Sequence, residues 1–196
     1  YTVERTDIAT DGSLTLRTQA EVDAFARSGI NTVEGNLTIG GEDEENPVTN
    51  LDGLKNLVSV RCDLTITAAY TGETLAGLEN LTACESLRIG SAAHPNETLR
   101  QLSLPALKEI KGDLCVYGTA LQTADFKSLQ SVAGHFVLQS DALLQLTADE
   151  LTTVAGNMTL IGTTADEAKA PCEQMYFPKL QRIDGTLTLS RFDRLS

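Results

Sequence analysis

The chain has 196 residues, of which 41% are hydrophobic, and its formal net charge is −12 at pH 7. The apolar content is enough for one continuous core. The acidic excess excludes nucleic acid as a partner, because phosphate binding requires a basic stripe. No run of residues approaches the about 18 consecutive apolar positions of a membrane-spanning helix.

The N-terminal part predicts a tether, one strand and one helix. Residues 1–11 are polar and are interpreted as the tether, and residues 13–16 predict a short strand. Thr18 and Glu21 form a capping-box pattern, so a helix should begin there and end near Gly29. We expect this helix to cover the N-terminal end of the core that follows.

A ten-residue frame then recurs about every 25 residues. It reads leucine, two spacers, valine or isoleucine, a spacer, glycine, a polar residue, leucine, a polar residue and isoleucine. Its copies span residues 30–39, 57–66, 81–89 (one residue short), 107–116, 129–138, 151–160 and 180–189. A period of about 20 to 50 residues is typical of a solenoid, in which each unit buries its apolar face by stacking on its neighbours. We therefore predict a single domain over residues 12–196, with about seven to eight coils.

Each frame ends in a predicted strand. The strands begin at Leu37, Leu64, Leu87, Leu114, Phe136, Met158 and Leu187. One strand per coil predicts a parallel sheet along the solenoid. The preceding glycine, as at Gly156, should either adopt a positive φ or allow close backbone approach. Pro105 and Pro178 predict a single helical or 3₁₀ turn. The fold class is thus mainly β, a right-handed parallel β-helix with a short N-terminal capping helix.

The C-terminal end is expected to need a cover. Residues 191–196 are too few to cover a coil, and an uncovered solenoid end is a liability. We therefore expect a packing partner or a further domain there.

Three stretches carry a family resemblance: residues 33–39 (Val-Glu-Gly-Asn-Leu-Thr-Ile), 51–57 (Leu-Asp-Gly-Leu-Lys-Asn-Leu) and 78–81 (Leu-Glu-Asn-Leu). They resemble receptor L domains, the right-handed β-helical relatives of leucine-rich repeats in the extracellular parts of the insulin and epidermal growth factor receptors. Similar repeats occur in fungal cell-wall proteins and in surface lipoproteins of Gram-negative gut bacteria. The cysteines that flank the animal receptor domains are missing, so the bacterial proteins are the better match in style.

The resemblance covers about residues 12–190 and implies an extracellular, cell-surface protein. In a Gram-negative bacterium it implies anchoring in the outer membrane through a lipid attached upstream. It implies no shared catalytic residue and no cofactor, and the members of the family bind different partners.

Four cysteines allow three pairings. Cys62 and Cys84 occupy nearly equivalent places in adjacent coils, and neighbouring strands lie about 4.8 Å apart, within reach of a disulfide. We predict that bridge. A bridge between Cys115 and Cys172 is left open, because the two lie some two coils apart.

Metal sites and glycosylation are weaker interpretations. Residues 42–45 (Glu-Asp-Glu-Glu) are interpreted as a solvated loop, with a Ca²⁺ site as the alternative. Zinc is not expected, because the chain has no Cys-x-x-Cys pair and only His94 and His135 besides the cysteines. Asn-x-Thr sequons at Asn36, Asn80, Asn96 and Asn157 are attributed to structure, two of them to the repeat itself; glycosylation is the alternative.

One carboxylate pair suggests catalysis. Asp63 and Asp113 share a repeat position two coils apart, which is about 9.6 Å from the strand spacing and near the upper range for inverting glycosidases. The same column also holds asparagine, serine, histidine and threonine, so a polar residue leaving the turn explains it equally well. A β-helical polysaccharide-degrading enzyme is therefore the third choice, and no catalytic residue is assigned.

The preferred function is a non-catalytic binding or adhesion module whose ligand is a protein or a glycan. The predicted contacts are Arg88, Tyr117, His135 and Gln139 on the outer sheet face, because exposed tyrosine and arginine are common binding anchors. The alternative location is one of the variable loops at 40–50, 67–77 or 161–176. The alternative function is a structural spacer within a longer surface protein.

Overall fold

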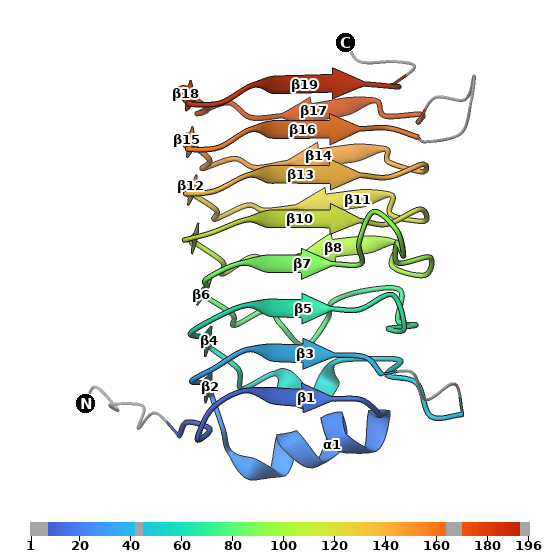
Figure 1. The fold of residues 1–196 in the computed structure, drawn as a ribbon, viewed down its shortest axis with the longest axis vertical. Coiled ribbons are helices and arrows are strands. Elements are labelled where there is room, and N and C mark those ends of the chain that lie inside the picture. Colours follow the sequence, from blue (N-terminus) through green and yellow to red (C-terminus); the bar gives the residue numbers. More distant parts are fainter. Residues whose placement is uncertain (1–7, 42–44, 164–169, 193–196) are drawn as a thin grey trace.

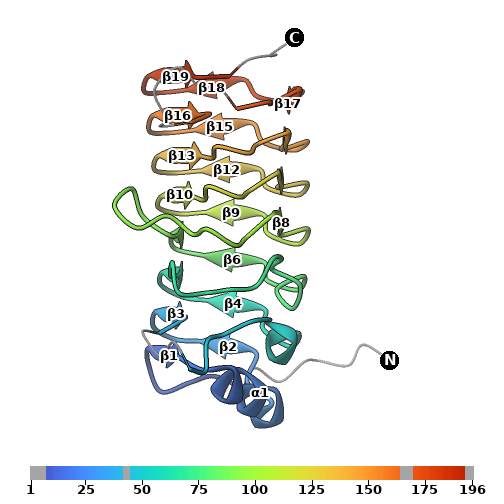
Figure 2. The same ribbon diagram turned by 90° about the vertical axis from the view of Figure 1, so that its right-hand side faces the viewer.

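The computed structural model describes residues 8–41, 45–163 and 170–192, and it is a parallel β-helix (Figure 1). All the strand pairs are parallel. The predicted parallel solenoid is confirmed. The prediction of one sheet was incomplete, because the walls contain three (Figure 2).

The largest sheet, called the front sheet, contains the predicted strands. Its eight strands are, in spatial order, β1 (Leu14–Leu16), β3 (Leu37–Ile39), β5 (Leu64–Ile66), β7 (Leu87–Ile89), β10 (Leu114–Tyr117), β13 (Phe136–Gln139), β16 (Met158–Ile161) and β19 (Leu187–Ser190). In register, the first residue of each strand stacks on the first residue of the next, as Leu114 does between Leu87 and Phe136. Inward and outward side chains therefore form continuous columns.

Two smaller sheets complete the walls. The side sheet is formed by β2 (Thr32–Val33), β4 (Ser59–Val60), β6 (Ala83–Cys84), β9 (Glu109–Ile110), β12 (Ser131–Val132), β15 (Thr153–Val154) and β18 (Arg182–Ile183). The rear sheet is formed by β8 (Gln101–Ser103), β11 (Thr123–Asp125), β14 (Gln145–Thr147) and β17 (Gln174–Tyr176). The side strands coincide with the valine or isoleucine of the repeat frame, whereas the rear strands lie outside it.

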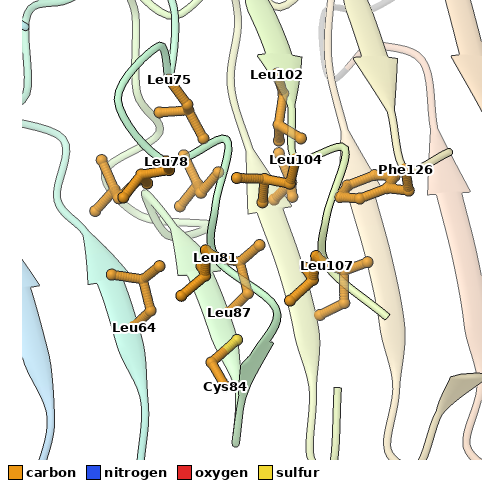
Figure 3. Close-up of a cluster of buried hydrophobic side chains, with 14 of the residues drawn as sticks. Leu64, Leu75, Leu78, Leu81, Cys84, Leu87, Leu102, Leu104, Leu107 and Phe126 are labelled. Atoms are coloured by element: carbon orange, nitrogen blue, oxygen red, sulfur yellow. The ribbon is translucent and has the colours of Figure 1, made fainter. Parts of the chain in front are cut away.

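The core is one continuous cluster along the axis. Figure 3 shows part of it, with Leu64 and Leu87 from the front sheet, Leu78 and Leu81 from the segment before β6, and Leu102 from the rear sheet. All five side chains are buried. Burial of a leucine side chain contributes about 1.5–3 kcal/mol, so the stacked columns stabilise the whole wall.

The repeat glycines serve close approach. At Gly156 an added Cβ would lie 2.7 Å from Gly134 O, and at Gly185 it would lie 2.8 Å from Asn157 N. Neither has a positive φ, so of the two sequence-based alternatives the close approach is confirmed and the positive φ is wrong. The two proline segments each form a single turn, closed by hydrogen bonds from Leu107 N to Leu104 O and from Leu180 N to Phe177 O, both 3.2 Å.

The N-terminal end is closed as predicted. Helix α1 (Gln19–Ser28) has Thr18 as its N-cap with a complete capping box, and it ends at Gly29 in the left-handed conformation. Two of its side chains, Val22 and Phe25, are buried. The adjacent 3₁₀ helix η1 (Asp52–Leu54) packs so closely that Gly53 has no room for a Cβ against the carbonyl of Val22.

The last described coil is open. Leu187 and Leu189 of β19 are 51% and 49% exposed, whereas Leu114 and Val116 in the same columns are fully buried. No helix among the described residues is long and apolar enough to cross a membrane.

Candidate functional site

Arg88 lies between two carboxylates on the outer face of the front sheet. Its Nε is 3.8 Å from Asp63 Oδ2 and its Nη2 is 3.6 Å from Asp113 Oδ2. All three side chains are partly exposed, so each ion pair contributes little to stability. The cluster carries one positive and two negative charges, and Arg88 therefore does not form a site for an anion.

Tyr117 and Gln139 lie side by side, as predicted from their columns. They are register partners at the ends of β10 and β13. Partial burial is the main cause that raises the pKa of the Tyr117 phenol; nearby Cys115 raises it further and Arg88 opposes the shift. The hydroxyl is therefore neutral at physiological pH and can both donate and accept a hydrogen bond.

His135 lies away from this pair. It precedes β13, at the opposite end of the strand from Gln139, a separation of about 13 Å for four extended residues. Its backbone N–H donates to Asp113 Oδ1, and its Nδ1 accepts the N–H of Asn157, both at 2.9 Å. The structure thus assigns His135 a role in the wall, and the four predicted contacts do not converge on one point.

The column that contains Asp63, Asp113 and His135 is a hydrogen-bonded stack, here called the acceptor column. In it, a side chain accepts the backbone N–H of the equivalent residue in the next coil. The steps run from Ser13 to Asn36, Asn36 to Asp63, Ser86 to Asp113, Asp113 to His135, His135 to Asn157 and Asn157 to Thr186, at 2.9–3.3 Å. The step from Asp63 to Ser86 has no such bond among those described, and it falls where the repeat is one residue short.

This column accounts for the carboxylate pair that suggested catalysis. Asp113 accepts from the next coil, and Arg88 bridges Asp113 to Asp63. An inverting hydrolase needs room for a water molecule between its two carboxyl groups, and here a guanidinium links them. The geometry favours a structural role for both residues.

A recess that the sequence did not reveal lies beside Arg88. It measures about 590 Å³ and is lined by Gly40, Gly41, Thr65, Thr67, Ala68, Ala69, Gly90, Ser91 and His94. Thr65 forms its floor on the outer face of β5, where it is the register partner of Arg88. The wall is formed by the loop after β7, which stands out from the front sheet (Figure 2).

The loop is fixed to the body at both ends. Gly90 has a positive φ of 60° and donates to Ile66 O at 2.8 Å. Asn96 N donates to Tyr117 O at 2.9 Å, and the Asn96 side chain donates to Tyr70 O at 2.8 Å. The recess is therefore built on anchored backbone, and its rim adjoins the Tyr117 strand.

The lining is chemically simple. Hydroxyl groups come from two threonines and one serine, an imidazole comes from His94, and the remaining lining residues are glycine and alanine. Such a surface can exclude water over a small flat ligand and orient it with a few hydrogen bonds. Two of the loops considered from sequence, 40–50 and 67–77, contribute to it. The third, 161–176, lies partly outside the described residues.

The predicted disulfide is wrong, because Cys62 and Cys84 are free thiols on opposite sides of the wall. Cys62 is exposed and its thiol donates toward Glu34 O at 3.9 Å. Cys84 is buried and is the register partner of Ile110. Cys84 occupies the inward valine or isoleucine position of the repeat frame, because the residue that this copy lacks comes after it. Its burial, with smaller contributions from Asp63 and Glu85, raises its pKa to about 12.

The other sequence interpretations have mixed outcomes. Cys115 and Cys172 are also free thiols, the first half-buried and the second buried. Asn96 is fully buried and hydrogen-bonded, and Asn36 and Asn157 bond within the acceptor column, which supports the structural interpretation of these sequons. Residues 42–44 of the acidic loop lie outside the described residues. Within the described ranges no group of three or more His, Cys, Asp or Glu side chains could hold a metal ion.

Comparison with known proteins gives no match to a family model, a curated protein or a solved structure.

Proposed function

We propose that the protein is a non-catalytic binding module of the receptor L type, which displays its ligand site on the front sheet. The parallel β-helix and the recurring ten-residue frame support this proposal. The observation that carries it is the recess over Thr65, because it is the hollow that adjoins Arg88 and the Tyr117 strand.

The proposed contact surface runs from the recess to Tyr117. Thr65, His94 and Ser91 supply hydrogen-bonding groups within the recess, and Tyr117 with Gln139 supplies an aromatic and an amide beyond it. Arg88 lies between them and is held by its two carboxylates. The ligand is a protein or a glycan without strong negative charge, because the face around Arg88 carries a net negative charge.

The proposed location is the cell surface, with a lipid anchor upstream in a Gram-negative outer membrane. The receptor-L-like repeat supports this. The proposed binding chemistry needs no cofactor.

A protein and glycan array probed with the full chain tests the proposal. Thr65→Trp should fill the recess and abolish the array signal, since its side chain points outward into the hollow. Thr159→Trp is the matched control, because Thr159 occupies the same outward row four strands farther along. Tyr117→Ala should weaken binding by about 1 kcal/mol or more. Binding that survives Thr65→Trp and Tyr117→Ala unchanged would place the site elsewhere.

A structural spacer is the second candidate, and the exposed core residues of β19 favour it. An open coil suits a module that continues into, or packs on, another body. Array binding that responds to Thr65→Trp would argue against a pure spacer.

A further inference from the structure

The outer face of the rear sheet is a flat polar surface that the front-sheet proposal does not use. Its outward residues form two rows across β8, β11, β14 and β17. The rows are Gln101, Thr123, Gln145 and Gln174, and Ser103, Asp125, Thr147 and Tyr176. The middle residue of each strand points into the core, as Leu146 does. All eight outward side chains can form hydrogen bonds, and none is positively charged.

A hollow lies at each end of these rows. The larger measures about 640 Å³ and is lined by Thr123, Leu144, Gln145, Glu173, Gln174, Met175 and Tyr176. The smaller measures about 220 Å³ and is lined by Thr74, Leu75, Ala76, Glu79, Gln101 and Ser103. Three strand spacings separate β8 from β17, which is about 14 Å. The surface between the hollows therefore suits an extended ligand more than a compact one.

The larger hollow combines an aromatic surface with amides. Tyr176 is 46% exposed, and Leu144, which lines the same hollow, is also exposed. The Gln145 Nε2 donates to Gln174 Oε1 at 3.3 Å, which aligns the two amides across neighbouring strands. Each amide keeps further donors and acceptors for a ligand. An exposed tyrosine offers an apolar ring face and a polar tip.

The charges limit the ligand class. Glu173 lies in the larger hollow and Glu79 in the smaller, and neither lining contains a lysine or an arginine. Asp125 lies between them and accepts from the Thr147 hydroxyl at 3.0 Å. Carboxylates repel a uronate, sulfate or phosphate, but they accept hydrogen bonds from neutral hydroxyl groups.

We propose that the rear sheet binds a neutral oligosaccharide that lies along the solenoid axis across its four strands. One sugar ring packs on Tyr176 and bonds to the Gln145 and Gln174 amides, and the chain continues over Thr123 toward Gln101 and Ser103. This site is distinct from the front-sheet recess and does not depend on it.

Titration calorimetry of the full chain with neutral hexose oligosaccharides of two to six units tests the proposal. Affinity should rise with length until the rows are covered. Tyr176→Ala and Gln145→Ala should each lower affinity about tenfold or more, since each removes a principal contact. Tyr176→Phe should keep most of the affinity, because the ring face remains. Thr159→Ala on the front sheet, outside the proposed front-sheet surface, is the control and should have no effect.

Four results would overturn the inference. The first is no binding of any neutral oligosaccharide in the panel. The second is wild-type affinity in both Tyr176→Ala and Gln145→Ala. The third is equal or tighter binding of an oligouronate of the same length. If Thr65→Trp abolishes saccharide binding and Tyr176→Ala does not, the sugar belongs to the front recess, so this inference fails while the proposed function stands. An unchanged melting temperature confirms that each exposed-site variant is folded.

Discussion

The two ends of the solenoid differ in whether their outermost coil is covered. At the N-terminal end, α1 covers the first coil, and Val22 and Phe25 are buried. At the other end, Leu187 and Leu189 repeat the inward positions of the coils before them but remain half exposed. The repeat alone therefore does not bury a residue; burial requires a neighbour on both sides.

Truncation of the same column at two places should give very different costs. Leu114→Ala should lower the free energy of unfolding by about 2–5 kcal/mol, because it leaves a cavity between coils. Leu187→Ala lies in the same column, and we expect a cost of about 1 kcal/mol or less, since half of its side chain is already in water. Chemical denaturation measures both. Equal costs would mean that the last coil is covered in solution.

Alkaline pH should lower the free energy of unfolding. Burial raises the pKa of Cys84 from 9.0 to about 12, and burial also raises that of Tyr70. Because the pKa of the Cys84 thiol is higher in the folded state than in the unfolded state, its neutral thiol contributes fully to stability below pH 9. This contribution is lost as the pH rises from 9 toward 12. For Cys84 the loss is of the order of 4 kcal/mol. Denaturation midpoints between pH 8 and 11 measure it.

Cys84→Ala is the control for this prediction. Its pH dependence above 9 should be shallower than that of the wild type, although the truncation lowers stability at every pH. A slope identical to that of the wild type would mean that the thiol is accessible to solvent.

Removal of the helix cap should open the closed end. Thr18→Ala should cost about 1 kcal/mol, because the side chain accepts the Glu21 N–H and completes the capping box. Hydrogen exchange should show faster exchange in α1 than in the wild type. In the wild type, the amides of β18 and β19 should already exchange faster than those of α1. Equal protection at the two ends would contradict the comparison.

Thiol labelling should distinguish the exposed thiol from the buried one without changing stability. A maleimide at neutral pH should label Cys62, which is exposed, and leave Cys84 unmodified until the chain unfolds. Mass spectrometry of a non-reduced digest gives both answers. A Cys62–Cys84 bridge in that digest would restore the original sequence interpretation.

The repeat predicted most of the fold because its information is local. The front strands and their columns follow from the Leu-x-Ile positions, and α1 follows from Thr18 and Glu21. The rear strands were missed, because segments such as Thr123–Asp125 lie outside the ten-residue frame, and three alternating residues alone are too few to predict a strand. Cys84 was misplaced because it was compared with Cys62, which stands at the glycine position of the frame, whereas Cys84 stands at the inward valine or isoleucine position.

The candidate sites were harder to predict because they depend on contacts between separate loops. Arg88 and Tyr117 were predicted from their outward positions on the front sheet, but Asp63 and Asp113, which hold Arg88, were considered apart from them. The recess over Thr65 needs the loop containing His94 to fold back over the preceding coils, and no local pattern encodes that. The length of the segment between Ile89 and Gln101 was the one available signal, because it interrupts the regular coil.

The acceptor column also bears on how quickly the molecule assembles. Each bond in it joins residues only 22 to 29 positions apart, so no coil has to wait for a distant part of the chain. Sequence-local contacts favour rapid folding. During synthesis the capped end is complete first, and each later coil meets a finished surface that already presents the next acceptor. We therefore expect assembly to proceed in the order of translation.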